Sequence, residues 1–275
     1  MRTLQNFVLA IVCFCAAGKI FANDIVFLGD EARLELVKKC GTECLGTNLK
    51  IGTPVRGASA SQVANSAQAA RHAIIVVDAA TGPLPITREH VLIARQAGVP
   101  SLSVMFVNMP LLEVMRDAPE LVELEELEVR ELMNKYEMGG DTTMVFHDAS
   151  IRSIPKLYTN GIGLKAVLSK VQSLPARKII PLEKYSGRSF HAYLYLLTKL
   201  ESKNVVVLRQ GSSIDLWING QSVRAVVKSS RPLSPGGNDE LVFEAQAPIN
   251  APLGSRLILE LEGKIIAAGV LSRGG

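Results

Sequence analysis

The chain has 275 residues, of which 48% are hydrophobic and 20% are charged, and its formal net charge is +4 at pH 7. This composition is ordinary for a globular protein and excludes a disordered or collagen-like chain. The length suffices for one large domain or two medium domains with a sizeable core, and a net charge of this size is too small to argue for nucleic-acid binding.

The N-terminus has the pattern of a secretory signal peptide. Arg2 precedes an almost wholly apolar run over residues 7–17, and the small residue Ala22 stands just before Asn23. A cationic start, a short apolar core and a small residue at the end are typical of such signals, and the run is too short for a stable membrane anchor. We therefore predict a signal peptide over residues 1–22 and a periplasmic or secreted mature protein. The alternatives are an uncleaved anchor and a buried first strand.

Cleavage of this signal leaves two of the four cysteines, Cys40 and Cys44. In an oxidising compartment such a pair can form a disulfide. On a helix, cysteines four residues apart share one face and lie within disulfide range. The alternative is that both are small buried hydrophobic residues. We expect no metal site, because no second Cys or His pair follows.

Hydrophobic patterning predicts an α/β region after the signal. The short β-branched runs Ala73–Asp78 and Leu102–Val107 are typical of strands buried on both faces. Residues 83–100 between them predict a helix, since prolines suit its first turn and Gly98 suits its end. Strand, helix and strand with short connections form the βαβ unit of a parallel sheet. Further strands are predicted at 24–28 and 142–146, and further helices at 31–40, 58–71, 111–137 and 162–171.

The last third of the chain predicts an all-β region over residues 184–275, after a linker at 173–187. Turn signals such as Asn219-Gly220 and Glu262-Gly263 separate the expected strands. These strands are predicted at 190–197, 205–208, 213–218, 223–227, 240–246, 256–261 and 264–271. We expect an antiparallel β-barrel or sandwich. This region holds 11 Lys and Arg against 7 Asp and Glu without a dense basic stripe, so we expect no nucleic-acid partner.

Residues 81–100 read TGPLPITREHVLIARQAGVP. This wording closely resembles a segment of the GTP-binding domain of the bacterial elongation factor Tu family, and the likeness continues at residues 128–136 and at Gly140-Asp141. Residues 234–270 resemble the last β-barrel of that family without a gap. The resemblance implies a GTPase-like three-layer α/β domain over residues 24–180, followed by the family's third-domain barrel over 184–275. The middle barrel of the family is missing.

This sequence departs most clearly from the family's pattern at the phosphate loop. In the family it is a Gly-rich turn ending in Gly-Lys-Thr, whose N–H groups and Lys bind phosphate and whose hydroxyl holds magnesium. Residues 29–34 keep Gly29 but have no Lys-Thr pair, and Asp30 and Glu31 add negative charge. We interpret Arg33 as a solvated helix residue rather than as a substitute for the lysine.

The other nucleotide motifs of the family are also degenerate here. The short connection before Gly52 leaves no room for the first switch. The second switch corresponds to residues 52–56, which keep only Pro54 and have Arg56 at the position of the family's histidine. The base-reading motif corresponds to residues 108–111, which keep Asn108 and lack the aspartate. We therefore expect no catalytic residues, no bound nucleotide or other cofactor, and no metal.

Together these features imply a catalytically inactive, exported protein of elongation factor Tu type that binds another protein as a decoy or adaptor. The alternative is a working GTPase that binds GTP and delivers aminoacyl-tRNA in translation. A decaying gene duplicate without a selected function is a third interpretation. The sequence does not identify the partner protein.

A candidate partner face lies on the acidic helix predicted at 111–137. It carries Glu125, Glu128 and Glu131, and the family's corresponding helix lies on the face that meets the nucleotide-exchange partner. A plain solvated surface helix is the alternative. No hydrolase motif is present, and we interpret His90, in the helix at 83–100, as structural.

Overall fold

The computed structural model describes residues 24–43, 48–68, 70–152, 157–174 and 184–275. The predicted signal peptide therefore lies outside the described residues. The first region contains β1 (Ile25–Gly29), α1 (Arg33–Glu43), β2 (Ile51–Gly52), α2 (Ala60–Ala67), β3 (His72–Asp78), α3 (Pro85–Gln96), β4 (Leu102–Val107), the 3₁₀ helix η1 (Met109–Val114), α4 (Ala118–Lys135), η2 (Gly140–Thr142), β5 (Met144–His147) and α5 (Leu164–Gln172). Among the described helices, none is long and apolar enough to cross a membrane.

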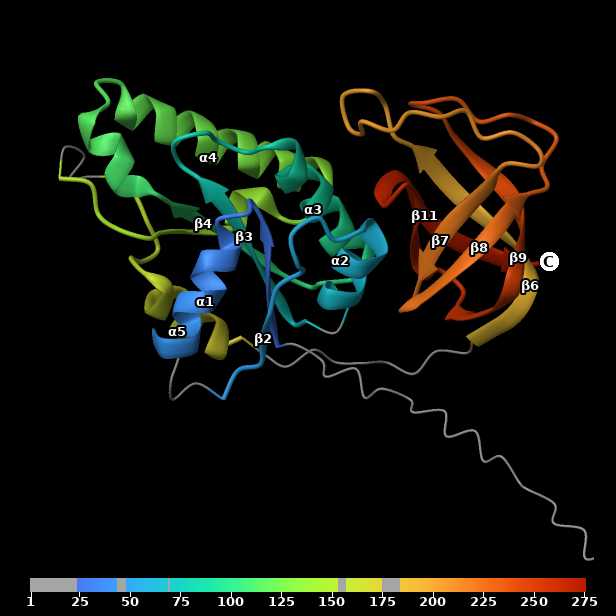
Figure 1. Cartoon of the computed structure of the whole chain (residues 1–275), viewed down its shortest axis with the longest axis horizontal. Coiled ribbons are helices and arrows are strands. Elements are labelled where there is room, and N and C mark those ends of the chain that lie inside the picture. The colour runs from blue at the N-terminus through green and yellow to red at the C-terminus, as the bar shows by residue number, and fades with distance from the viewer. Residues whose placement is uncertain (1–23, 44–47, 69, 153–156, 175–183) are drawn as a thin grey trace, which may run out of the picture.

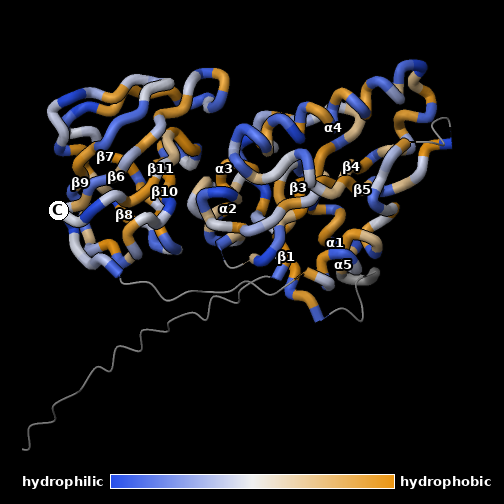
Figure 2. The backbone as a smooth tube through the Cα atoms, turned by 180° about the vertical axis from the view of Figure 1, so that it is seen from behind, coloured by the Kyte–Doolittle hydropathy of each residue, from blue (hydrophilic) through white to orange (hydrophobic). Residues whose placement is uncertain are grey.

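The first region is a three-layer α/β structure. Its five strands are parallel in the order β2-β1-β3-β4-β5. Successive residues of a strand point to opposite faces. Ile75 and Val77 of β3 therefore pack toward α2, α3 and α4, while Ile74 and Val76 pack toward α1 and α5. Both faces are covered, which explains why the central strands read as unbroken apolar runs (Figure 2).

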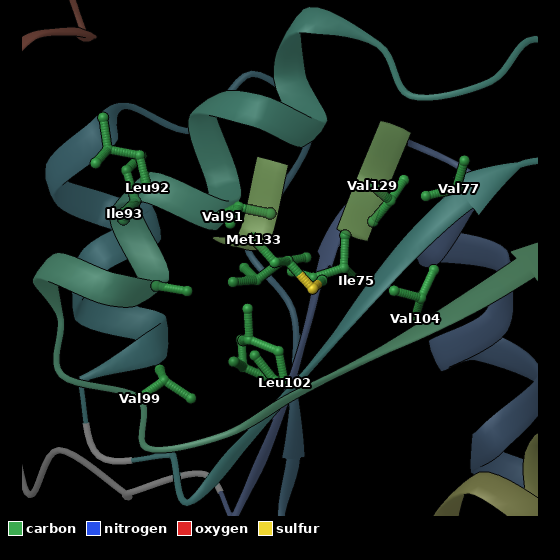
Figure 3. Packing of buried hydrophobic residues seen from close by; sticks show 14 of the residues in the cluster. Ile75, Val77, Val91, Leu92, Ile93, Val99, Leu102, Val104, Val129 and Met133 are labelled. Carbon is green, nitrogen blue, oxygen red and sulfur yellow. The ribbon is translucent and has the colours of Figure 1, made fainter. Parts of the chain in front are cut away.

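The larger core lies between the sheet and the helices α3 and α4. Ile75, Val91 and Met133 come from β3, α3 and α4, and their side chains converge in this layer (Figure 3). All three are fully buried. Residues 81–100 therefore supply α3, which connects β3 to β4 as predicted for a βαβ unit. The same helix packs in one layer with α4.

The second region is a closed antiparallel barrel, not a sandwich. Its strands are β6 (Lys184–Leu196), β7 (Ser213–Ile218), β8 (Gln221–Val227), β9 (Asn238–Pro252), β10 (Arg256–Leu261) and β11 (Lys264–Gly274). They follow one another around the barrel in the order β10-β11-β6-β9-β8-β7, and β10 pairs with β7 to close it. The predicted order, α/β followed by all-β, is confirmed.

Several elements differ from the sequence prediction, three of them in a way that changes the architecture. Residues 205–208 form no strand and contribute only one bridge, between Leu208 and Leu233. The helix expected over 111–137 is divided into η1 and α4, and α4 begins with Pro119 in its first turn, where a missing N–H costs little. The barrel strand expected from residue 190 already begins at Lys184, so the linker is shorter than predicted.

The barrel packs against α2 and α3 (Figure 1). Trp217, Ile258 and Ile265 of the barrel belong to the same buried cluster as the apolar residues of these two helices. We call this contact the seam, made by α2 and α3 on one side and by β7, β10 and β11 on the other. The two regions therefore share one buried apolar cluster, while the interior of the barrel forms a cluster of its own.

Candidate functional site

The turn after β1 occupies the position of the phosphate loop expected from the resemblance. Gly29 ends the strand with a φ of 90°, and a Cβ there would lie 2.3 Å from the carbonyl oxygen of Val76. Only glycine fits such a close approach without strain. The retained Gly29 is therefore explained by packing between β1 and β3.

His90 of α3 lies directly beneath this turn. The backbone N–H of Gly29 donates to Nδ1 of His90 at 2.9 Å. Burial, followed by the positive charges of Arg33 and Lys264, lowers the pKa of His90 to about 3. The imidazole is therefore neutral, with Nδ1 as an acceptor, and it holds the turn in place as expected of a structural histidine.

Arg33 contradicts the prediction of a solvated helix residue. Its side chain is only 1% exposed and folds back into the turn. Nη1 donates to the carbonyl oxygens of Gly29 and Asp30, both at 3.1 Å, and Nη2 donates to the carbonyl oxygen of Pro54 at 3.3 Å. A guanidinium presents several fixed donors, so one buried side chain satisfies carbonyl groups from two loops.

The second loop is fixed to the first by further polar contacts. Thr53 Oγ1 donates to the carbonyl oxygen of Phe27 at 3.0 Å. Glu31 pairs with Arg33 at 3.3 Å and with the exposed Arg56 at 3.1 Å. The structure therefore brings together four of the five degenerate positions, Gly29, Arg33, Pro54 and Arg56. We call the turn at residues 29–33 together with residues 53–56 the cradle.

The electrostatics of the cradle are opposite to those of a phosphate site. A phosphate loop directs backbone N–H groups at an anion. In the cradle, carbonyl oxygens point inward to a cation that belongs to the chain itself. Asp30 Oδ1 accepts the N–H of Ala32 at 2.9 Å, which uses a donor that a phosphate would need.

Asn108, the fifth degenerate position, belongs to a separate network at the ends of β3 and β4. It adopts a left-handed backbone with a φ of 61°. Its Nδ2 donates to Asp78 at 2.8 Å, and its N–H donates to Asp148 at 2.8 Å. The N–H of Met109 donates to the other oxygen of Asp148 at 3.2 Å. The polar atoms of this loop therefore stabilise the conformation of the loop through hydrogen bonds within the protein.

The three glutamates of the candidate partner face do not share one exposed surface. Glu125 is 5% exposed and lies on the buried side of α4. Glu128 is partly exposed and pairs with Arg88 of α3. Glu131 is exposed. The expectation of a common face is wrong for Glu125, because position 125 shares the buried helix face with Val122 and Val129.

A histidine between two serines escaped the sequence reasoning. His72 at the start of β3 contacts Ser101 Oγ through Nδ1 at 2.8 Å and Ser103 Oγ through Nε2 at 2.9 Å. Burial, and then the charge of Arg71, lowers the pKa of His72 to about 4. Both ring nitrogens contact hydroxyls, and no carboxylate of the described residues orients the ring, so this histidine is a poor general base. In the sequence, only the alternation of Ser101 and Ser103 at the start of one strand indicates that the two hydroxyls can face the same neighbouring residue.

Cys40 of α1 is 5% exposed and disulfide-bonded. Its partner lies outside the described residues, so the pairing with Cys44 stays a prediction. Among the described residues, no group of three or more His, Cys, Asp or Glu side chains is arranged to hold a metal ion.

Residues 59–182 match the model of the elongation factor Tu GTP binding domain. The match begins just before α2 and extends past α5, so it includes the segment 81–100 and the acidic helix α4. It does not include the cradle. The α/β region is therefore similar to the GTP binding domain of elongation factor Tu over residues 59–182, which supports the resemblance seen in the sequence.

Proposed function

We propose that this chain keeps the scaffold of a translational GTPase, does not bind GTP, and acts by binding another protein as a decoy or adaptor. The observation that carries the first part is the burial of Arg33 inside the cradle. Its guanidinium fills the position where the resemblance would put the phosphates.

Binding of a nucleotide would require the cradle to be rebuilt. Arg33 would have to withdraw from three carbonyl oxygens. A buried acceptor left without a donor costs about 1–3 kcal/mol. The phosphate would then face carbonyl oxygens and the carboxylates of Asp30 and Glu31 without a lysine or a metal ion. The charge-assisted contacts on which phosphate binding normally depends are therefore missing.

Export to the periplasm or the exterior is part of the same proposal. It rests on the N-terminal pattern and is supported by the disulfide-bonded Cys40, because disulfides persist mainly in oxidising compartments. Such a protein would not meet aminoacyl-tRNA, which favours a protein partner. Mass spectrometry of the mature N-terminus tests this part: we expect Asn23 as the first residue, and an intact Met1 would contradict export.

The outer side of α4 is the surface we propose for the partner. Leu124 and Leu127 are 64% and 52% exposed. They are flanked by the exposed carboxylates of Glu120, Glu123 and Glu131. Apolar contacts within an acidic surround fit a partner surface that is basic at its rim and apolar at its centre. Captured proteins should be compared between the unmodified chain and a Leu124→Ser/Leu127→Ser variant, and a partner retained equally by both would contradict this face.

GTP binding is tested by thermal unfolding with and without 1 mM Mg-GTP. A ligand at 100 times its dissociation constant stabilises a fold by about 2.7 kcal/mol. We expect no shift of the melting temperature, because the cradle offers no phosphate site. An authentic GTPase of similar size serves as the positive control.

The alternative is a working GTPase that binds GTP and delivers aminoacyl-tRNA, and the same titration decides between the two. A rise of several degrees with GTP, absent with ATP, would refute the proposal and support the alternative. The substitution Arg33→Lys should not create binding, since the metal and base contacts are absent as well.

A further inference from the structure

Glu125 of α4 is a buried carboxylate beneath the turn that follows β3. It is 5% exposed and shares the inner face of the helix with the fully buried Val122 and Val129. Its side chain lies against Gly82, where an added Cβ would meet Oε1 at 3.2 Å and Cγ at 3.3 Å. Glu125 therefore contacts the turn at residues 79–82, which leads into α3.

No hydrogen-bond donor or cation serves this carboxylate among the described residues. Oε2 is buried and has no hydrogen-bond partner, and no ion pair within the described ranges involves Glu125. A buried carboxylate without a donor is costly when it is charged, so it takes up a proton instead.

The charged groups that face Glu125 make its ionisation harder still. Asp78 at the end of β3 and Glu128 one turn along α4 are both acidic. Arg88 of α3 pairs with Glu128 and not with Glu125. Asp78 already has donors for both oxygens, Ala80 N–H at 2.9 Å and Asn108 Nδ2 at 2.8 Å. Glu125 is thus the member of this group that has no donor of its own.

We propose that Glu125 is a proton-operated latch that holds α4 against the turn at residues 79–82. With its proton, Glu125 is neutral and packs beside Asp78 and Gly82. Without it, two carboxylates face each other in a site that lacks a cation, and the turn and the middle of α4 loosen. This latch uses residues outside the cradle and does not depend on the proposed function.

The pH range follows from the charge environment. Burial, and then the charges of Asp78 and Glu128, raises the pKa of Glu125 from 4.5 to about 7. A group with a raised pKa in the folded state contributes stability that is complete below the unfolded pKa. That contribution falls as the pH rises from about 4.5 to 7 and is lost above this range. The latch is therefore closed in mildly acidic surroundings and open in alkaline ones.

Hydrogen exchange of the full chain at pH 6.0 and pH 8.5, corrected for intrinsic rates, tests the latch. We expect exchange in residues 79–84 and 120–130 to be at least about tenfold faster at pH 8.5, since each pH unit between the two pKa values corresponds to a factor of about ten. Glu125→Gln, which is neutral at both pH values, should remove the difference. Glu131→Gln, at an exposed position of the same helix, should leave it unchanged. A difference of equal size in the chain with Glu125→Gln would overturn the proposal.

A second measurement uses only the unmodified chain, so it tests the latch even if the Glu125→Gln variant does not fold. Carboxyl carbon NMR should show one glutamate with a titration midpoint near 7. If every glutamate titrates below pH 5, the latch does not exist.

Discussion

The cradle and the seam differ in where their buried polar groups find partners. In the cradle, Arg33 donates to carbonyl groups of Gly29, Asp30 and Pro54, which lie in two loops of the α/β region. At the seam, Gln96 of α3 is 3% exposed and donates to the carbonyl oxygens of Leu257 and Gly269 in the barrel, at 2.7 and 3.0 Å. The cradle is thus complete within the α/β region, whereas the seam is complete only when the barrel is docked.

The seam repeats this pattern at two further points. Glu260 of β10 accepts the N–H of Ser61 at 2.7 Å, in the first turn of α2, where a carboxylate is favoured. Trp217 Nε1 donates to Asn65 Oδ1 at 2.7 Å. Polar groups that are satisfied only across a contact specify one docking geometry. In the cradle, the side chain of Arg33 fills the position expected for the phosphates. At the seam, the polar contacts hold the barrel against the α/β region.

The largest effect is expected from Arg33→Met, which keeps the length of the side chain and removes its donors. The carbonyl oxygens of Gly29 and Pro54 lose the Arg33 donor, at about 1–3 kcal/mol for each buried group, so we expect a loss of about 3 kcal/mol in the free energy of unfolding. Urea unfolding followed by circular dichroism measures it. Arg56→Met is the matched control, because Arg56 pairs with the same Glu31 while 77% exposed, and exposed pairs contribute about 0–1 kcal/mol. Equal losses in both variants would show that Arg33 does not fill the cradle.

A smaller effect is expected from Gln96→Leu, which keeps the volume and removes the two bonds across the seam. We expect a loss of about 2 kcal/mol, from two hydrogen bonds worth about 1 kcal/mol each. Exchange at the amides of β10 and β11 should become faster, while that of β1 and β3 should not change. Gln210→Leu, at an exposed barrel position, should change stability by less than about 0.5 kcal/mol. Faster exchange confined to the parallel sheet would contradict the role of Gln96.

The smallest effect is expected from Glu201→Gln, at the rim of the seam. Glu201 of the barrel accepts from Lys135 of α4 at 2.7 Å and from Tyr195 and Thr198 of the barrel. Burial opposes its charge, but these hydrogen bonds outweigh burial and lower the pKa of Glu201 to about 2. At pH 7 we expect a loss of about 1 kcal/mol, in the range of a typical net hydrogen bond.

The free energy of unfolding at low pH tests the same variant further, because the direction of its change with pH is predicted. A carboxylate with a lowered pKa contributes stability above its unfolded pKa and loses it as the pH falls. The unmodified chain should therefore lose this contribution between about pH 4.5 and 2, and Glu201→Gln should flatten the curve there. If both chains have parallel stability curves over this range, Glu201 is not held as a charged acceptor.

Most of the fold was accessible from the sequence because it depends on local patterns. The apolar runs of β3 and β4 and the turn signals of the barrel predicted these elements within a few residues. The strand expected at 205–208 was wrong, since a short β-branched run does not reveal whether a neighbouring strand is available. The single helix expected over 111–137 was also wrong, although Pro119 indicates the division, because proline fits the first turn of a helix and disrupts a helix interior.

The candidate site was less predictable because its contacts are not local. The sequence predicts a solvated Arg33, because its spacing on α1 does not show that the side chain folds back toward Pro54. Glu125 was grouped with Glu128 and Glu131 by charge, although its helix position matches that of the buried Val122 and Val129. Charged residues are almost never fully buried, so both predictions followed the usual rule and failed where the chain departs from it.

The closed barrel has a consequence for how the chain folds as it is made. β6 pairs with β11, which follows all the other described barrel strands in the chain, and the barrel closes only when β10 reaches β7. All five strands of the parallel sheet precede the barrel in the chain, so that sheet can form first. Until β10 and β11 arrive, the sides of α2 and α3 that belong to the seam have no cover. Such transiently exposed apolar surface promotes aggregation, and nascent chains halted near residue 255 should be the forms most strongly retained by chaperones.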